Sequence, residues 1–584
     1  MDETRQIIVD TISKTGGHLA SNLGIVELTQ AIHRVYDPYT DRIVFDVGHQ
    51  CYPHKIMTGR KEQFGSVRQF GGLSGFPKPS ESIADAFIAG HASNSVSVAL
   101  GMARARTLQG ESYEVACLIG DGALTGGLAY EGLENAGHSA ERLVVILNDN
   151  EMSIAPNVGA VAHMLKRLAE RPSYYNLKRR YRKFLMRHRI GEKLFHFTRA
   201  IKQRVKRLLL SSGANMFEDL GFRYFGPVDG HDVEKIVFLL KEARDSSCPA
   251  IVHVLTTKGK GYEPAELNPD LYHGVSAFDS SKPLEPSFQQ TYSTVFGSEL
   301  TRLAEEDPRI CAITAAMPYG TGLDGFAKRF SNRFFDEGIT EAHSLTMAAG
   351  MAKQGARPVF AVYSTFLQRA YDSLIHDIAM LSLPVVIGVD RCGLVGEDGE
   401  NHHGIFDLPM LMAIPHLEVY CPATFDELRM VLRAALSQDS HPVAIRYPRG
   451  SGEFTEVARA SEPCKVTVVA YGTMAINAAD ALRKSGITGQ MIRLVRIKPL
   501  DVTEIAKSVR ETGRLAVLED VVEHGCVGEV ILAELAAIGV IPRRVTLCNC
   551  GSRFVTHGEV SVLWKSLGLD AETFAVKLRE LAES

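Results

Sequence analysis

The sequence predicts an α/β protein built from parallel, doubly wound sheets, and two observations carry this prediction. Short apolar runs typical of buried strands alternate with helical segments along most of the chain, which is the pattern of strand-helix-strand units. Glycine-rich or polar turns directly follow several of these runs, as at Gly120-Asp121-Gly122. Open parallel sheets bind ligands at the carboxyl ends of their strands, so these turns are candidate binding sites.

Length and composition indicate a multidomain globular protein. The chain has 584 residues, more than one hydrophobic core usually serves, and it is 45% hydrophobic and 23% charged. A formal charge of −4 gives no reason to expect a nucleic acid or a membrane surface as partner. No apolar run approaches the ~18 residues of a membrane span, and the amino terminus lacks a basic-then-apolar signal. We therefore expect a cytoplasmic protein.

Ten cysteines are scattered along the chain without CxxC spacing, so we expect reduced thiols and no zinc site. A basic stretch at about residues 160–212 has no aromatic platform or nucleic-acid motif. We interpret it as a solvated helical excursion from the first domain.

Three tandem doubly wound α/β domains are expected, at residues 1–290, 291–462 and 463–584. Residues 263–290 have the proline, serine and acidic content of a linker, which sets the first boundary. Residues 222–232 are rich in turn formers and are expected to form a loop. The expected strands are residues 43–47, 115–119, 143–147, 250–255, 310–314, 334–338, 358–362, 385–389, 466–470, 490–494, 516–518 and 545–547.

The most informative stretch runs from Cys117 to Ile154 and reads as a strand-helix-strand unit. Its two strands end at Asp121 and at Asn150, which places one carboxylate and one amide oxygen at the carboxyl ends of parallel strands. Magnesium prefers about six oxygen ligands and usually takes several from waters and a bound phosphate. The sequence therefore predicts a metal that links the protein to a diphosphate. An ordinary polar turn is the structural alternative.

This unit resembles the thiamin diphosphate signature, a GDG followed at a distance by an asparagine. The segments GHQCYPHK, GDGALTGG, LNDNEMSI, YSTFLQRAYDSLIHD and RYPRG are similar to the 1-deoxy-D-xylulose-5-phosphate synthases, a transketolase-like family, and the resemblance covers nearly the whole chain. It implies thiamin diphosphate and Mg²⁺ as cofactors, a homodimer, and three domains of the diphosphate-binding, pyrimidine-binding and transketolase C-terminal types. It also implies pyruvate and D-glyceraldehyde 3-phosphate as substrates and the first step of non-mevalonate isoprenoid synthesis. The product would also be a precursor for thiamin and pyridoxal biosynthesis.

The resemblance implies a set of ligand-binding residues. Asp121, Asn150 and the backbone carbonyl of Met152 would hold the metal, and Ile154 would bend the cofactor. Helix capping alone would explain the polar residues near Ser93, and a surface turn would explain Lys258. The other implied cofactor-binding residues are His49, His91, Ala92, Ser93, Gly122, Ala123, Lys258, Tyr262, Glu341, Tyr363 and Phe366.

The implied catalytic carboxylate is Glu341, in the motif ITEAH. A buried glutamic acid with a raised pKa could share a proton with the pyrimidine ring of the cofactor. A glutamate that only complements a helix dipole is the alternative. The other implied catalytic residues are His18, His49, Asp398 and His402, and the candidate substrate-binding residues are Arg369, Arg391 and Arg449.

The sequence departs from the family pattern at several of these motifs. Pro79 stands where most relatives carry an arginine that is thought to meet the donor carboxylate, so either Lys78 substitutes for it or donor handling differs. Ala342 replaces the usual glutamine after Glu341, and GHASNS and DGENHHG also differ from the usual text. Two alternatives stay open at this point, which are a transketolase-type ketol transfer and a non-catalytic paralogue.

Overall fold

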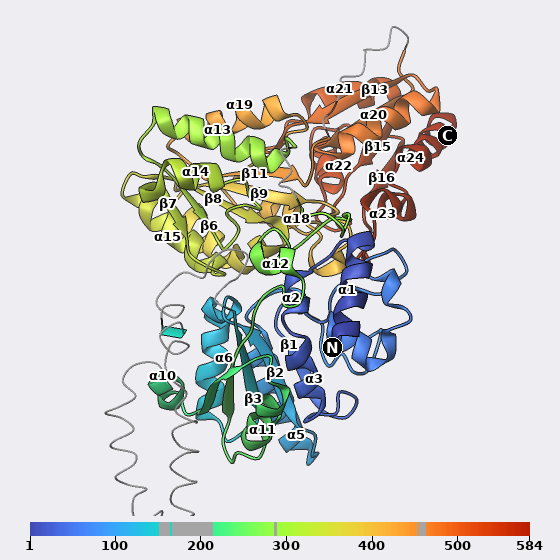
Figure 1. Ribbon diagram of the computed structural model, residues 1–584. Coiled ribbons are helices and arrows are strands. Elements are labelled where there is room, and N and C mark those ends of the chain that lie inside the picture. The colour runs from blue at the N-terminus through green and yellow to red at the C-terminus, as the bar shows by residue number, and fades with distance from the viewer. Residues whose placement is uncertain (151–163, 166–213, 285–288, 453, 455–462) are drawn as a thin grey trace, which may run out of the picture. The chain divides into compact units, whose positions relative to one another are not determined.

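The computed structural model describes residues 1–150, 164–165, 214–284, 289–452, 454 and 463–584 (Figure 1). These form two compact units. The first comprises Met1–Val67 and Gly72–Pro286, and the second comprises Arg68–Gly71 and Ser287–Ser584. Met152, Ile154 and nearly all of the basic stretch at 160–212 lie outside the described residues.

The first unit contains a five-stranded parallel sheet in the order β1-β2-β3-β5-β4. Ala116 and Leu118 of β2 belong to a core cluster with residues of α1, α3 and α11, while α5 packs on β1 and β2 outside that cluster. Helices therefore cover both faces of the sheet, which confirms the predicted doubly wound class. The strands are β1 Arg42–Phe45, β2 Val115–Gly120, β3 Val144–Asp149, β4 Arg223–Asp229 and β5 Ala250–Leu255.

The expectation of a loop at residues 222–232 is wrong, because β4 lies there. Gly226-Pro227 reads as a turn in the sequence. In the structure the pairing with β5 shifts register between Phe225 and Val228, and this irregularity takes up the two turn-forming residues inside the strand. Phe225 and Val228 are buried on either side of it.

Helices of the first unit follow from apolar residues at helical spacing. In α1, for example, Ile8 and Ile12 are fully buried one turn apart. In α11, the side chain of Asp232 caps the helix by accepting a hydrogen bond from the backbone N–H of Lys235. The helices are α1 Asp2–Thr15, α2 Ala20–Leu23, α3 Val26–His33, α4 Tyr52–Lys55, α5 Ser95–Gln109, α6 Gly127–His138, α10 Ala214–Asp219, α11 Val233–Arg244 and α12 Glu263–Leu267.

The second unit contains two sheets. The larger has seven strands in the order β14-β10-β11-β9-β8-β6-β7, all parallel except β14, and the smaller is parallel with the order β13-β12-β15-β16. The strands are β6 Ile310–Thr314, β7 Phe334–Asp336, β8 Arg357–Tyr363, β9 Val386–Cys392, β10 Glu418–Tyr420, β11 Val443–Pro448, β12 Val466–Tyr471, β13 Gly489–Leu494, β14 Arg496–Lys498, β15 Arg514–Leu518 and β16 Arg544–Cys548.

Three strands of the second unit were not predicted, namely β10, β11 and β14. Two of them are only three residues long, and β11 ends in the polar sequence RYP, so none shows the apolar run on which the prediction depended. Strand β14 pairs with β10, so a segment after residue 463 forms the edge of the larger sheet.

The guanidinium of Arg446 is buried between the carboxylates of Asp407, at 2.9 Å, and Asp520, at 3.3 Å.

The helices of the second unit surround its two sheets (Figure 1). None of the described helices combines the length and apolar character that crossing a bilayer requires. All ten cysteines are free thiols, as expected. The helices are α13 Tyr292–Glu306, α14 Asp324–Arg329, α15 Glu341–Lys353, α16 Ser364–Leu367, α17 Tyr371–Ser373, α18 Asp407–Ala413, α19 Phe425–Ser437, α20 Met474–Ser485, α21 Thr503–Thr512, α22 Val527–Ala537, α23 Val560–Leu567 and α24 Ala571–Glu583.

Two helical glycines give a matched test of packing in the second unit. A Cβ at Gly297 in α13 would lie 1.8 Å from the backbone oxygen of Gly322, whereas a Cβ at Gly350 in α15 would meet no atom within 4 Å. We expect Gly297→Ala to lower the free energy of unfolding by about 2–3 kcal/mol or more. Gly350→Ala should raise it by about 0.5–1 kcal/mol through helix propensity. Denaturant unfolding of both variants checks this, and equal effects would contradict the described packing.

Candidate active site

Asp121 and Asn150 meet at the ends of neighbouring strands in the first unit. Asp121 directly follows β2 and Asn150 directly follows β3, and the backbone N–H groups of Gly122 and Asn150 hydrogen-bond the Asp121 carboxyl. The predicted crossover therefore brings the two predicted residues, Asp121 and Asn150, together at adjoining strand ends. Asp121 is only 4% exposed, so its carboxyl lies inside the protein rather than in a surface turn.

A second carboxylate, from Asp149 at the end of β3, faces Asp121. Burial raises the pKa of Asp121 well above its usual range, and the neighbouring Asp149 raises it further through its charge and a hydrogen bond. Two buried carboxyl groups that face one another, with Asn150 next in the chain, are a donor set suited to a hard divalent cation, which would offset the repulsion between the carboxylates. The residues present therefore fit a magnesium site. The sequence analysis missed Asp149, although it stands beside Asn150.

Lys258 lies close to this carboxyl pair. Its side chain is 6% exposed, and burial lowers the pKa of the amine to about 8, while the charges of Asp270 and Asp121 act to raise it. The loop after β5 that carries Lys258 is held against α2, because Gly259 N–H donates to the backbone oxygen of Ala20 at 2.8 Å. Lys258 is thus a buried cation of the site and not a residue of a surface turn.

The predicted segment GHASNS is fixed by a buried carboxylate that the sequence analysis also missed. Asp46, just after β1, accepts hydrogen bonds from the backbone N–H groups of Ser93 (2.7 Å) and Ser95 (3.0 Å), where α5 begins. Ser93 has a left-handed φ of 73°, and its hydroxyl donates to the backbone oxygen of Ala123 at 2.7 Å. These bonds tie the segment carrying His91, Ala92 and Ser93 to the Gly122-Ala123 turn.

Three histidines form a cluster in the first unit, and one of them was not predicted. The ring centroids of His18 and His49 lie 5.3 Å apart, and His273 lies 5.6 Å from His18 and 5.3 Å from His49. The buried amide of Asn22 donates to the backbone oxygens of both His18 (2.6 Å) and His49 (2.8 Å). This histidine cluster joins loops that are far apart in sequence. His273 lies in the segment interpreted as a linker, which is why it was missed.

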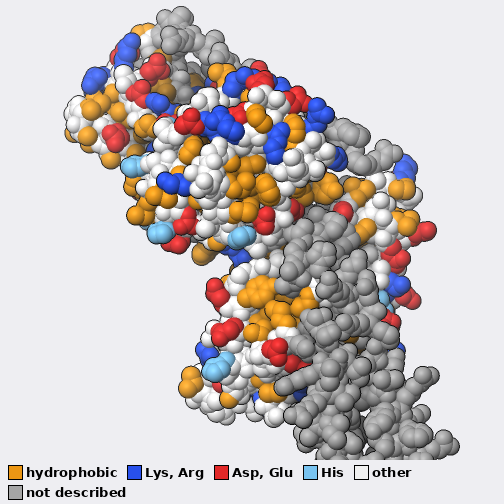
Figure 2. All heavy atoms as spheres, turned by 90° about the vertical axis from the view of Figure 1, so that its left-hand side faces the viewer, with side chains coloured by type: hydrophobic (Ala, Val, Ile, Leu, Met, Phe, Trp, Pro, Cys, Tyr) orange, Lys and Arg blue, Asp and Glu red, His pale blue; other side chains and the backbone are white. Residues whose placement is uncertain are grey.

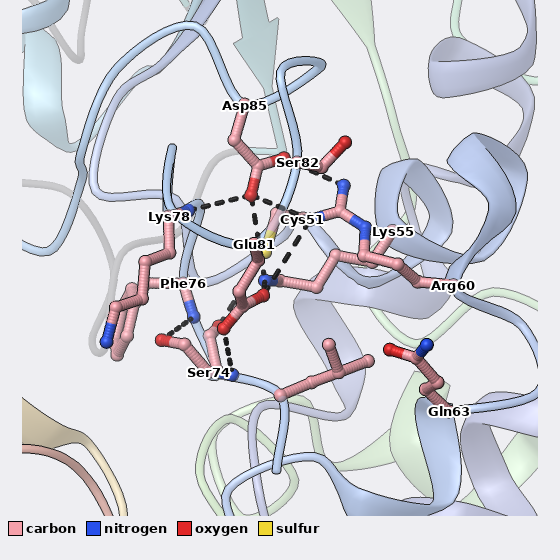
Figure 3. A network of polar contacts seen from close by, with 12 residues as sticks. Cys51, Lys55, Arg60, Gln63, Ser74, Phe76, Lys78, Glu81, Ser82 and Asp85 are labelled. Carbon is pink, nitrogen blue, oxygen red and sulfur yellow. Dashed lines mark hydrogen bonds and ion pairs between the residues drawn. The ribbon is translucent and has the colours of Figure 1, made fainter. Parts of the chain in front are cut away.

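A buried network holds the loop from Ser74 to Asp85 against α4 (Figure 3). Lys55 Nζ lies 2.5 Å from Glu81 Oε2, and both guanidinium nitrogens of Arg60 donate to Asp85 at 2.8 Å. Burial acts to raise the pKa of Asp85, but the hydrogen bonds from Arg60 and His54 lower it well below its usual range. His54 and Lys55 are therefore part of the scaffold of this loop.

The same network places the loop that departs from the family pattern. Lys78 N–H donates to Asp85 Oδ2 at 2.7 Å, and Glu81 Oε1 accepts from Ser74 N–H at 2.6 Å. The ring of Phe76 packs edge-on against His18, with centroids 5.7 Å apart. Pro79 is exposed. The loop is thus fixed on one side by ion pairs and carries Phe76 to the histidine cluster.

In the second unit, Glu341 begins α15 with its side chain buried. It is 4% exposed, and burial raises the pKa of its carboxyl, while the positive charge of Arg369, 3.9 Å away, opposes the shift. A carboxyl in this environment is stabilised as the neutral acid. Arg369, which was predicted to contact substrate, therefore lies beside the predicted catalytic carboxylate.

Four of the predicted residues form a stack in the second unit. The guanidinium of Arg391 lies 3.8 Å above the ring of Tyr363, which stacks on Phe366 with centroids 5.7 Å apart. Phe366 in turn contacts His402 edge-on at 5.7 Å. Arg391 has a left-handed φ of 58° and donates to the backbone oxygen of Gly320 at 2.8 Å. These residues of β8, α16, β9 and the loop after β9 therefore share one surface.

Asp398 is paired with an arginine that the sequence analysis missed. Arg68 is buried with a left-handed φ of 66°, and its guanidinium bonds to the Asp398 carboxylate. Arg68 also lies 3.9 Å from Glu397, which lies 4.0 Å from Arg449. The short segment Arg68–Gly71 thus groups with the second unit, although the residues on either side of it in the sequence belong to the first unit. No local motif marks this arginine in the sequence.

Tyr262, a predicted cofactor-binding residue, contacts residues that were not predicted to belong to the site. The hydroxyl donates to the backbone oxygen of Ser280 at 3.2 Å, and the ring packs edge-on against Tyr272. Its predicted contact with cofactor stays a prediction.

These features define a class of protein. A doubly wound sheet with carboxylate and amide donors at adjoining strand tips, and a separate sheet with a buried glutamate and an aromatic stack, are typical of transketolase-like thiamin diphosphate proteins. Residues 1–256 match the family model described as 1-deoxy-D-xylulose-5-phosphate synthase. Residues 289–453 match the pyrimidine-binding domain of transketolase, and residues 455–573 match its C-terminal domain.

Relatives of similar length place the chain more narrowly. A 1-deoxy-D-xylulose-5-phosphate synthase of Pelotomaculum thermopropionicum is 46% identical, over 98% of this chain and 92% of the relative. A 1-deoxy-D-xylulose-5-phosphate synthase of Clostridium kluyveri is 44% identical, over 100% of this chain and 95% of the relative. A solved transketolase from Leishmania mexicana is 16% identical with a TM-score of 0.43, over 100% of this chain and 96% of that one. The chain belongs to the 1-deoxy-D-xylulose-5-phosphate synthase family, whose members use thiamin diphosphate and a divalent metal ion.

The buried carboxyl of Glu341 predicts a pH-dependent stability. Its pKa is raised in the fold relative to about 4.3 in the unfolded chain, so its contribution is fully present below pH 4 and is lost as the pH rises toward the folded-state pKa. Glu341→Gln cannot lose a proton. We expect the free energy of unfolding of this variant to exceed that of the wild type increasingly from pH 4 upward, by at most about 1.4 kcal/mol per pH unit, as measured by denaturant unfolding at each pH. Exposed Glu580→Gln is the control, and parallel pH profiles for all three proteins would contradict the description of Glu341.

Proposed function

We propose that this chain decarboxylates pyruvate and joins the resulting two-carbon unit to D-glyceraldehyde 3-phosphate, which gives 1-deoxy-D-xylulose 5-phosphate and carbon dioxide. The observation that carries the proposal is the meeting of Asp121, Asp149 and Asn150 at adjoining strand ends, in a chain whose relatives bear this activity in their names. It is a transferase of the transketolase type with thiamin diphosphate as cofactor.

The oxygen donors of the first unit would hold the metal. Asp121 and Asn150 would bind Mg²⁺, together with the backbone carbonyl of Met152, and Lys258 would offset the charge of the diphosphate. When bound, thiamin diphosphate would supply the carbon that accepts pyruvate and would take up the electron pair that stays behind when carbon dioxide leaves. The protein supplies binding, orientation and charge.

Glu341 would hold a proton for the pyrimidine ring of the cofactor. The support is its burial and raised pKa, which favour the protonated carboxyl needed to donate a hydrogen bond to a ring nitrogen. Tyr363 and Phe366 offer a flat apolar surface for that ring. Two further roles stay predictions. Met152 would bind the metal through its backbone carbonyl, and Ile154 would be the apolar residue that bends the cofactor.

The histidine cluster and the arginines would handle the substrates. His18, His49 and His402 are candidates for proton transfer, and His273 joins them because its ring packs on two of these. Arg391 and Arg449 are candidates for the acceptor phosphate, because a guanidinium matches phosphate oxygens in pairs. Lys78, on the loop fixed by Glu81 and Asp85, is the candidate for the donor carboxylate in place of the usual arginine.

Assembly as a homodimer in the cytoplasm is part of the same proposal. Figure 2 shows several groups of exposed apolar side chains on one face, which are a feature of surfaces that bind another protein. The family resemblance makes a second copy of the chain the expected partner. Light scattering at several concentrations measures the mass in solution.

A direct activity assay tests the proposed reaction. Purified protein with thiamin diphosphate and Mg²⁺ should release carbon dioxide from pyruvate and consume D-glyceraldehyde 3-phosphate in equal amounts, as measured by a coupled assay and product analysis. Turnover that requires a ketose phosphate donor would contradict the proposal and favour ketol transfer. Absence of cofactor binding would favour a non-catalytic protein.

Removal of the metal-binding carboxylate should weaken cofactor binding. Because Asp121 would supply a direct metal ligand, we expect Asp121→Ala to lose affinity for thiamin diphosphate by on the order of 100-fold at fixed Mg²⁺, measured by titration calorimetry. Asp229→Ala is the matched control, since Asp229 also ends a strand of the same sheet, and its binding should be unchanged. Equal binding by both variants would refute the metal assignment.

A further inference from the structure

Three polar side chains form a chain of hydrogen bonds across three neighbouring strands of the first unit. One of them is Asp149, a member of the carboxyl pair. The hydroxyl of Tyr224 in β4 lies 2.7 Å from Nδ1 of His253 in β5, and Nε2 of His253 lies 2.8 Å from Oδ2 of Asp149 in β3. We name this set of Tyr224, His253 and Asp149 the relay. None of the proposed catalytic steps uses it.

The strand register places the three residues on one face of the sheet. Tyr224 pairs with Ile251, two residues before His253, and Asp149 pairs with Leu255, two residues after it. Side chains two residues apart on a strand point to the same side. The relay therefore crosses from the edge strand to the strand that carries the site.

Two of the three relay residues, His253 and Asp149, are buried, and Tyr224 is half-buried. His253 is 0% exposed and Asp149 is 2% exposed, and the ring of Phe217 stacks parallel to Tyr224 with an interplanar angle of 3°. A carboxylate accepts the Nε2–H of His253, which leaves Nδ1 to accept the hydroxyl proton of Tyr224. Each bond thus fixes the orientation of the next group.

Burying these polar groups costs free energy that their hydrogen bonds to one another only offset. Both neighbours of His253 in β5, Val252 and Val254, are fully buried and apolar, so a third apolar residue would have suited the core. Asp149 joins the relay to the predicted metal site, because its carboxyl interacts with that of Asp121. Carboxylates that bind a metal are themselves held by hydrogen bonds from residues that do not touch the metal.

We propose that the relay is a positioning device for the metal site, in which Tyr224 and His253 aim the Asp149 carboxylate at the cation or its bound water beside Asp121. This inference rests on the proposed function, because it needs a cation at Asp121. Tyr224 and His253 are positioning residues and touch neither cofactor nor substrate.

Titration of Mg²⁺ into protein saturated with thiamin diphosphate, followed by calorimetry, tests the relay. We expect His253→Leu to weaken apparent Mg²⁺ affinity by about 10- to 100-fold. Tyr224→Phe should weaken it by about 2- to 10-fold, as expected for one hydrogen bond. His253→Gln keeps a donor toward Asp149 and should recover part of the loss.

The control is Tyr113→Phe, which removes a tyrosine hydroxyl that donates to the backbone oxygen of Met102 at 2.9 Å, before β2 begins. It should bind Mg²⁺ as the wild type does, even if its melting temperature falls. Mg²⁺ affinity of His253→Leu within twofold of the wild type would overturn the proposal. If His253→Leu does not fold, the Mg²⁺ affinities of Tyr224→Phe and Tyr113→Phe are compared instead. Equal affinities of these two variants would overturn the proposal.

The Asp121→Ala variant separates this proposal from the proposed function. If Asp121→Ala loses Mg²⁺ binding while the relay variants keep it, the metal site stands and the relay is only structural. If Asp121→Ala keeps Mg²⁺ binding, the proposed metal site itself is wrong and the relay proposal falls with it.

Discussion

The carboxyl groups of Asp121 and Asp149 face one another inside the first unit, and this repulsive pair constrains the structure around it. Burial and mutual charge make the pair unfavourable as two free carboxylates, so a proton or a cation must offset it. The backbone N–H groups of Gly122 and Asn150, the amine of Lys258 and the ring of His253 all contribute to holding the pair in place. A divalent metal is the partner that this arrangement suits best.

The parallel sheet explains how such a pair arises. Strands β2 and β3 are neighbours in register, so the residues that follow their apolar runs meet at one edge of the sheet. Strand β1 brings Asp46, which fixes the start of α5, and β5 brings the loop of Lys258. In the second unit, Glu341 follows the carboxyl end of β7, Tyr363 is the last residue of β8, and Arg391 lies near the end of β9. Each unit uses its strand ends for polar chemistry and its strand centres for packing.

The sequence was sufficient for features that depend on local pattern. Long apolar runs located most strands, and polar turns after them located Asp121, Asn150 and Glu341. It failed where the signal is short or is made by tertiary contacts. Strands β10 and β14 are too short to show a pattern, and Gly226-Pro227 concealed β4. Arg68, Asp149 and His273 act through partners that are distant in sequence, so no spacing marks them.

The central claim is that a divalent cation sits at the ends of β2 and β3. A crystal of the protein grown with thiamin diphosphate and Mn²⁺, with diffraction recorded at an energy where manganese scatters anomalously, locates the ion without assumptions about activity. The account predicts an anomalous peak within about 2.3 Å of a carboxyl oxygen of Asp121. A fully occupied ion elsewhere in the protein, with Asp121 and Asp149 still facing one another and no peak between them, would contradict it.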